Sequence, residues 1–249
     1  MSRAQPEQKP DDRDKIPWSR LFRDEVLSDE VATLVTVFAA AVNGAAMGDR
    51  ALAAAADSES ADGEALLEAL LQLPLFAGFP RGINALASFR KYFGDEIGPN
   101  AKTKAASKPA TELDRDPKAL RKRGEALFRR VYADHAERVL ADLDRFHPDL
   151  GPWILTSAYG GILSRPQLDP ATRELCAVAA LIVSGDVRQL SSHLRGALHC
   201  GASPAKTRAA AERARPFVSP GAWQKAQVII TRTLNATPGS TPDGRPHAL

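Results

Sequence analysis

Three side chains that could carry out acid–base chemistry lie close together in this sequence. Glu174, His193 and Arg195 fall in an Ala-, Val- and Leu-rich stretch, residues 173–203. A carboxylate in so apolar a helix needs a partner or a chemical purpose. Histidine transfers protons near neutral pH, and a planar guanidinium suits a carboxylate ligand. The pattern predicts His193 as general acid or base, Glu174 as the residue that orients it, and Arg195 as a clamp for an anionic substrate.

The spacing around Gly185 indicates how Glu174 and His193 could come into contact. Glu174 lies 11 residues before Gly185 and His193 lies 8 after it. If Gly185 joins two antiparallel helices, the helical rise puts the two side chains roughly 16 Å and 12 Å from the turn. Glu174 and His193 could therefore approach each other across the pair. Arg195, two residues beyond His193, points to a different side of its helix.

Each of the three residues also has a purely structural interpretation. His193 could be a buried histidine that is hydrogen-bonded to Glu174. Arg195 could form a surface or intersubunit ion pair, and Glu174 could be a first-turn charge favoured by the helix dipole. The residue types alone leave these alternatives open.

Composition indicates an all-α protein. Of the 249 residues, 44% are hydrophobic but only 6% are aromatic, which favours the packing of small side chains between helices. The net charge of +3 does not suggest a nucleic-acid partner, and two cysteines make no disulfide framework. We recognise no signal peptide and no 18-residue uncharged apolar run. These features lead us to expect a cytoplasmic protein without a membrane partner.

The chain divides into two helical parts. Pro-, Gly- and charge-rich composition predicts disordered tails at 1–17 and 237–249 and a polar linker at 96–117. These flank an N-terminal part, 18–95, and a C-terminal part, 118–236. Apolar residues recur at three- and four-residue steps, which predicts helices over 30–42, 64–75, 126–143 and 174–183.

The two parts resemble each other weakly. The segment Asp29–Ala40 is similar to Thr172–Val183, with Glu30 against Glu174, and Phe76–Ala85 falls opposite Phe217–Ala226. In this alignment an Ala, at or near Ala55, replaces His193. The N-terminal part is therefore expected to be a degenerate repeat that packs against the other part and lacks an active site of its own.

Several linked motifs give the chain a resemblance to a known family. They are RKRGEALFRRVYADHAERVL (121–140), YGGILSRPQLDPATRELCAVAAL (159–181), HLRGALHCGAS (193–203) and, upstream, LPLFAGFPRGINAL (73–86). These stretches resemble the opening helix, the connection and core helix, the His-x-Arg-x-Ala-Leu-x-x-Gly helix end and the closing helix of the carboxymuconolactone decarboxylase family. That family shares its all-helical fold with the alkylhydroperoxidase D-like proteins.

The resemblance implies a chemistry and an assembly. It implies decarboxylation or related acid–base chemistry on a small carboxylated lactone, without a cofactor, with His193, Glu174 and Arg195 as catalytic residues. By analogy with single-repeat members of that family, which form ring-like oligomers with sites at subunit contacts, the resemblance also implies a homo-oligomer, a trimer of tandem chains.

Two departures from the family pattern limit this implication. Alkylhydroperoxidase D-like members carry a Cys-x-x-Cys-x-x-x-His motif, but Asp186 and Gln189 stand at the two cysteine positions before His193. An antioxidant peroxidase is therefore disfavoured, and a non-catalytic helical assembly stays open as a third interpretation. His199 and Cys200 stand where decarboxylases often have two Asn; without further ligands at suitable spacing, they do not predict a metal site.

Overall fold

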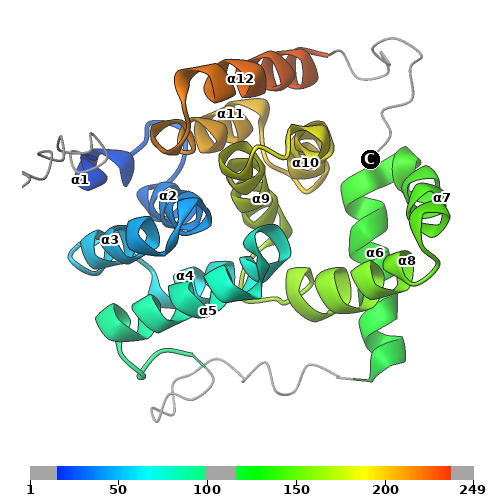
Figure 1. Ribbon diagram of the computed structural model, residues 1–249, viewed down its shortest axis with the longest axis horizontal. Coiled ribbons are helices and arrows are strands. Elements are labelled where there is room, and N and C mark those ends of the chain that lie inside the picture. The colour runs from blue at the N-terminus through cyan, green and yellow to red at the C-terminus, as the bar shows by residue number, and fades with distance from the viewer. Residues whose placement is uncertain (1–15, 99–115, 237–249) are drawn as a thin grey trace, which may run out of the picture.

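The protein is built from helices throughout the described ranges. The computed structural model describes residues 16–98 and 116–236, and these contain helices and turns but no strand, which confirms the all-α prediction. The N-terminal group comprises α1 (Trp18–Leu21), α2 (Asp29–Asn43), α3 (Ala45–Ala56), α4 (Gly63–Gln72) and α5 (Pro74–Phe93). A middle group follows with α6 (Pro117–Tyr132), η3 (Ala133–His135), α7 (Ala136–Phe146), α8 (Leu150–Trp153) and η4 (Ile154–Leu163). The last group is α9 (Pro170–Ser184), α10 (Val187–His199), α11 (Pro204–Glu212), η5 (Arg215–Phe217) and α12 (Pro220–Asn235) (Figure 1).

Helices α2 and α9 form the centre of the main core. Eleven consecutive residues of each are buried, from Ala32 to Val42 and from Thr172 to Ile182. A helix that is apolar on all sides is stable in water only when other helices surround it. The two helices pack against each other and bring the N-terminal and C-terminal groups into one core.

The N-terminal and C-terminal groups repeat the same capping pattern. Side chains cap the helices that begin after Ser28 and Asp169 and those that begin after Asp62 and Ser203. Glycines at 44 and 185 follow α2 and α9. The two residues of each pair, Ser28 and Asp169, Asp62 and Ser203, and Gly44 and Gly185, are separated by 141 positions. Phe76 and Phe217 have the same separation.

This register differs from the expected alignment near the site. Counted from the caps, Glu174 corresponds to Thr33 and His193 to Leu52, whereas Glu30 falls opposite Ala171. Thr33 and Leu52 are both fully buried. The N-terminal group thus has a hydroxyl and an alkyl chain where the C-terminal group has a carboxylate and an imidazole.

Two of the expected helices are interrupted. The periodic segment 126–143 is broken because α6 ends at Tyr132 and α7 begins at Ala136, with Ala133 at a φ of 46°. The segment 64–75 divides at Leu73, because Pro74 starts α5. Apolar periodicity continued through both breaks, so it could not reveal them. The expected tail at 1–17 and linker at 96–117 lie mostly outside the described residues, and the tail at 237–249 lies wholly outside them.

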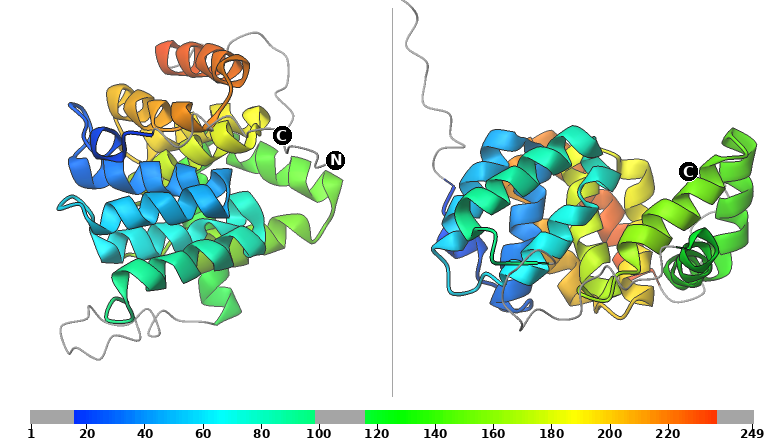
Figure 2. Two further views of the ribbon diagram at one scale, coloured as in Figure 1. Left: turned by 60° about the vertical axis from the view of Figure 1, so that its left-hand side comes forward. Right: turned by 90° about the horizontal axis from the view of Figure 1, so that it is seen from below.

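Helices α6 to η4 form a smaller unit beside the main core. Figures 1 and 2 show α6 and α7 on the side of the molecule away from α2 and α3. Helix α6 lies against η4, a π-helix, and Gly124 and Gly160 each face backbone atoms of the other helix. A Cβ atom at Gly124 would overlap the carbonyl oxygen of Leu155. The unit has its own apolar cluster, which includes Phe128, Val131 and Tyr159.

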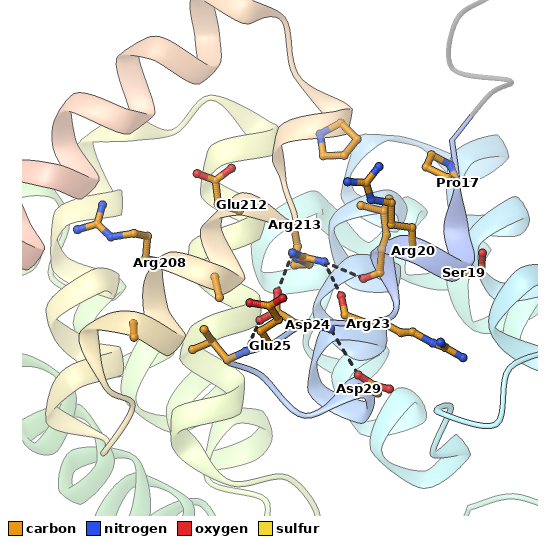
Figure 3. Close-up of a pocket in the computed structure, with 15 residues that line it drawn as sticks. Pro17, Ser19, Arg20, Arg23, Asp24, Glu25, Asp29, Arg208, Glu212 and Arg213 are labelled. Carbon is orange, nitrogen blue, oxygen red and sulfur yellow. Dashed lines mark hydrogen bonds and ion pairs between the residues drawn. The ribbon is translucent and has the colours of Figure 1, made fainter.

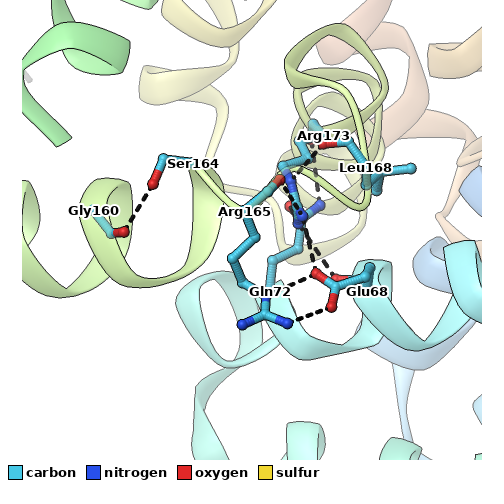
Figure 4. A network of polar contacts seen from close by, with 7 residues as sticks. All are labelled: Glu68, Gln72, Gly160, Ser164, Arg165, Leu168 and Arg173. Atoms are coloured by element: carbon cyan, nitrogen blue, oxygen red, sulfur yellow. Dashed lines mark hydrogen bonds and ion pairs between the residues drawn. The ribbon is translucent and has the colours of Figure 1, made fainter. Parts of the chain in front are cut away.

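A buried ion network joins α4 to the start of α9 (Figure 4). The carboxylate of Glu68 accepts hydrogen bonds from Arg165 at 2.8 and 2.6 Å and from Arg173 at 3.1 Å. The side chain of Arg173 is only 1% exposed. Arg173 also donates to the carbonyl oxygens of Leu168 and Arg165, so its guanidinium is well satisfied.

We predict that Gly124→Ala destabilises the fold. The added methyl group has no space against the Leu155 carbonyl, and overpacking of this kind costs about 1–3 kcal/mol of unfolding free energy. The matched control is Gly151→Ala in α8, where no atom lies within 4 Å of the added Cβ. Urea unfolding of both variants measures the difference; equal stability would contradict the close approach of α6 and η4.

We predict that Glu68→Gln is strongly destabilising. Removing one partner of a buried pair leaves the other charge uncompensated, at a cost of about 3–5 kcal/mol. Burial raises the pKa of Glu68, but Arg165 and Arg173 outweigh it and the pKa is lowered from its usual 4.5. A lowered folded-state pKa stabilises the protein above the unfolded-state value, and this contribution is lost as the pH falls through the folded-state value.

The stability difference between wild type and Glu68→Gln should therefore be largest above about pH 5 and shrink below it. The control is Glu125→Gln, which breaks the surface pair with Arg121, and it should cost less than about 1 kcal/mol. A pH-independent difference in urea unfolding would contradict the assigned role of the Glu68 carboxylate.

Candidate acid–base site

The expected approach of Glu174 and His193 is present as a short hydrogen bond. Gly185 ends α9 in the left-handed conformation, with a φ of 82°, and α10 returns along α9. The Nδ1 atom of His193 lies 2.8 Å from Oε2 of Glu174. Both side chains are largely shielded, with exposures of 11% for His193 and 5% for Glu174. An ionised Glu174 accepts the Nδ1 proton, so the other ring nitrogen, Nε2, carries the exchangeable proton or lone pair.

A glycine makes room for this carboxylate. A Cβ atom at position 196, three residues after His193, would lie 2.7 Å from Oε2 of Glu174 and 2.8 Å from a methyl group of Val131. Gly196 therefore allows α10 to approach the Glu174 side chain. The sequence shows this glycine within the His-x-Arg-x-Ala-Leu motif, but its spatial role depends on α6 and α9.

The N-terminal group supplies an aromatic wall to the site. The ring of Phe76, at the start of α5, meets the His193 ring edge-to-face with centroids 5.9 Å apart and an interplanar angle of 74°. Phe38 in α2 supports Phe76 in turn, with centroids 6.2 Å apart. The site is thus shared between the two halves of the chain. Sequence reasoning missed Phe76 as a site residue because 117 positions separate it from His193.

Two tyrosines lie behind Glu174, on α6 and η4. The rings of Tyr132 and Tyr159 have centroids 6.4 Å apart. Burial raises the pKa of Tyr132 to about 12 and that of Tyr159 well above its usual value, and the negative charge of Glu174 adds to both shifts. Both phenols therefore stay protonated at neutral pH and can act only as neutral hydrogen-bond groups. Sequence reasoning named neither, although Tyr159 stands in the quoted aromatic-Gly motif.

Arg195 is not part of this pair. It lines a cavity between α10 and α12. Within the described parts of the chain, no hydrogen bond or ion pair connects Arg195 to Glu174 or His193. The two-residue step turns a side chain by about 200° around a helix, so His193 and Arg195 face nearly opposite sides of α10.

Neither thiol is poised for redox chemistry. Cys176 is fully buried in α9, and burial raises the pKa of its thiol far above the usual value. Burial and the nearby Glu174 carboxylate raise the pKa of Cys200 to about 12. Because the thiolate is the reactive form, both residues are poor nucleophiles at neutral pH.

His199 and Cys200 connect α10 to the end of α6. Nδ1 of His199 donates to the carbonyl oxygen of Val131 at 2.8 Å, and Arg130 donates to the carbonyl oxygen of Cys200 at the same distance. No group of three or more potential metal ligands occurs within residues 16–98 and 116–236.

A broad surface groove lies elsewhere, between the α1–α2 segment and α11 (Figure 3). Its central charged residue, Arg213, forms an ion pair with Asp24 at 2.7 Å and donates to the carbonyl oxygens of Leu21 and Arg23. These contacts fasten the first helix to the C-terminal group. We therefore interpret Arg213 as structural. None of the described helices is both long and apolar enough to cross a membrane.

Three known proteins are similar to parts of this chain. "Peroxisomal protein 2" of Schizosaccharomyces pombe is 32% identical over 139 residues, which cover 55% of this chain and 61% of that protein. "Peroxisomal protein 2" of Saccharomyces cerevisiae is 26% identical and matches 54% of this chain and 53% of its own length. "4-carboxymuconolactone decarboxylase" of Acinetobacter baylyi is 36% identical over 67 residues, 27% of this chain and 50% of that enzyme. The matches span between half and about three fifths of these relatives.

A family model also matches the part of the chain that holds the site. The model of the carboxymuconolactone decarboxylase family covers residues 150–229, a range that contains Glu174, His193 and Arg195. This match, the decarboxylase relative and the all-helical architecture agree with the motifs recognised in the sequence. Residues 150–229, in the C-terminal half of the chain, are therefore similar to the carboxymuconolactone decarboxylase family.

Proposed function

We propose that the chain is a cofactor-free enzyme that carries out acid–base chemistry, and specifically decarboxylation, on a small carboxylated lactone. The observation that carries this proposal is the 2.8 Å hydrogen bond between Glu174 and His193. It holds the imidazole in one orientation and leaves Nε2 to exchange a proton with a substrate, as general acid–base catalysis requires. Proton transfer is the one chemistry for which the described site residues are equipped.

The proposed reaction needs only one protein-derived proton. The bond between the substrate carboxylate and the ring carbon breaks, CO₂ leaves, and the electron pair moves into the conjugated lactone carbonyl. Protonated His193 delivers the proton on Nε2 to the resulting enolate carbon, and solvent restores that proton. Glu174 keeps the imidazole oriented, and Phe76 and the two neutral tyrosines limit the access of water to the pair.

The names of the relatives support decarboxylation as the reaction class, but they do not determine the cellular compartment. The name of the bacterial relative states a decarboxylase, which favours a carboxylated lactone as the substrate class. The two yeast relatives are named as peroxisomal proteins, so a peroxisomal location competes with the expected cytoplasmic one. Imaging the full chain with an internal tag distinguishes the two compartments.

The direct test is an assay of the purified full chain with 4-carboxymuconolactone, monitored by release of CO₂. We expect turnover that exceeds the rate with His193→Ala. Release of CO₂ at the same rate with wild type and variant would reject the proposal for this substrate.

We predict that His193→Ala lowers kcat by about 10²–10⁴, the usual contribution of a positioned acid or base. Glu174→Gln should give a smaller loss, because the amide can still accept the Nδ1 hydrogen bond but orients the imidazole less strongly than a carboxylate does. His135→Ala, at an exposed histidine in η3, is the control and should retain full activity. If folded His193→Ala turns over like wild type, the histidine is structural.

We predict that the double variant Cys176→Ala, Cys200→Ala keeps the decarboxylase activity. Both thiols are protonated at neutral pH and neither occupies a motif position before His193. The measurement is kcat alongside turnover of an organic hydroperoxide. Hydroperoxide turnover by wild type that disappears in the double variant would instead favour the antioxidant interpretation.

We also propose that the chain is a homo-oligomer, in line with the trimer implied by the family resemblance. Phe79 and Ile83, one helical turn apart on α5, are 74% and 63% exposed, which is unusual for large apolar side chains. We predict that Phe79→Asp with Ile83→Asp reduces the sedimentation coefficient. Trp153→Asp, at an equally exposed aromatic residue on α8, is the control. A monomeric wild-type chain at micromolar concentration would contradict the proposal.

A further inference from the structure

A small, partly open cavity lies between α10 and α12, on the side of α10 away from His193. Its volume is about 130 Å³, roughly ten times the probe-occupied volume that one water molecule needs. Among the described residues, those that line it come from these two helices: Val187, Arg188, Ser191 and Arg195 from α10, and Val228, Ile229, Arg232 and Thr233 from α12. The space suits a small ligand.

The charged side chains that line this cavity in the described part of the chain all carry the same sign. Arg188, Arg195 and Arg232 contribute three guanidinium groups, and none of the eight lining residues is acidic. Every ion pair found among the described residues involves other side chains, so no described carboxylate neutralises these three. Like charges gathered in one concavity repel each other, and a bound anion relieves that repulsion.

Arg195 gives the strongest indication of a missing counter-charge. It is partly buried, and burial lowers the pKa of its guanidinium. Elsewhere in this protein a buried guanidinium has a carboxylate partner: Arg173 has Glu68 and Arg213 has Asp24. Arg195 has lost hydration without such a partner in the described chain, which is costly unless a ligand supplies the negative charge.

The remaining walls complete a binding site for an oxyanion. The hydroxyls of Ser191 and Thr233 lie 3.3 Å apart across the two helices and can donate to ligand oxygens. Val187, Val228 and Ile229 form apolar walls, which lower the local dielectric and strengthen charge-assisted hydrogen bonds. Guanidinium forks from two helices favour a ligand with several oxygens and more than one negative charge.

We propose that this cavity binds a small, multiply charged oxyanion, such as a phosphate group or a dicarboxylate. The site is distinct from the Glu174–His193 pair, because α10 presents the two on nearly opposite faces. It reassigns Arg195 from a clamp beside His193 to the centre of a separate anion site that fastens α12 to α10. The proposal does not depend on the decarboxylase function.

The test is calorimetric titration of the full chain with inorganic phosphate, with succinate as the second arm and acetate at matched ionic strength as the reference. We expect saturable binding, at one site per chain, of phosphate, succinate or both, and much weaker binding of acetate. Which of the two binds more tightly identifies the anion chemistry. If neither binds better than acetate, the proposal is overturned.

Variants locate the binding without reliance on activity. Arg188→Gln with Arg232→Gln changes two exposed residues and should weaken binding at least tenfold, as should Arg195→Met alone. Lys225→Gln, an exposed cation on α12 outside the cavity, should bind like wild type. Unchanged affinity in the double variant, with circular dichroism showing an intact fold, would overturn the assignment.

A thermal measurement separates ligand binding from a structural role. In anion-free buffer, Arg195→Met should raise the Tm, because an uncompensated, partly buried charge is removed. Phosphate should raise the Tm of wild type and leave that of Arg195→Met unchanged. A lower Tm for Arg195→Met without phosphate, together with an equal phosphate-dependent rise in both proteins, would instead show that Arg195 only supports the fold.

Discussion

The buried carboxylate of Glu68 is the interaction on which the geometry of the site depends. It holds Arg165 and Arg173 and so fixes where α9 begins relative to the N-terminal group. Glu174 is the next residue after Arg173, so α9 directs one charge toward α4 and the adjacent one toward α10. Gln72, at the end of α4, also donates to the Arg173 carbonyl and lies just before α5, which supplies Phe76. One ion network thus positions both the carboxylate and the aromatic wall of the acid–base pair.

The N-terminal group packs against the candidate site but does not repeat its Glu–His pair. At the positions that correspond to Glu174 and His193 it has Thr33 and Leu52, both fully buried. Thr33 bonds within its own half, to the carbonyl of Asp29 and to Ser60. Burying a second carboxylate and imidazole would carry a desolvation cost, so a hydroxyl and an alkyl chain suit a packing surface better. What this half contributes to the site is one ring, that of Phe76.

Local signals in the sequence predicted the acid–base pair, and contacts between distant segments explain what it could not predict. Gly185 and the cap at Asp169 define two adjoining helices, and their lengths bring Glu174 to His193. The break at Ala133 has no such signal, because apolar spacing continues through it and only the packing of α6 and α7 requires it. Phe76 and Tyr132 reach the site from other helices, and part of the surroundings of Arg195 comes from α12. The sequence of residues 173–203 therefore could not predict these contacts.

The two faces of α10 differ in the charged groups that they meet. Toward α9 a single carboxylate meets a single imidazole among phenols and thiols whose raised pKa values keep them neutral, so the only mobile charge there is a proton. Toward α12 three fixed positive charges surround a small cavity. A thiol-based enzyme would need a stabilised thiolate beside the histidine, but the carboxylate of Glu174 opposes that ionisation at Cys200. The same carboxylate orients the imidazole through Nδ1, so the geometry at His193 supports the proposed proton transfer better than thiol-based redox chemistry.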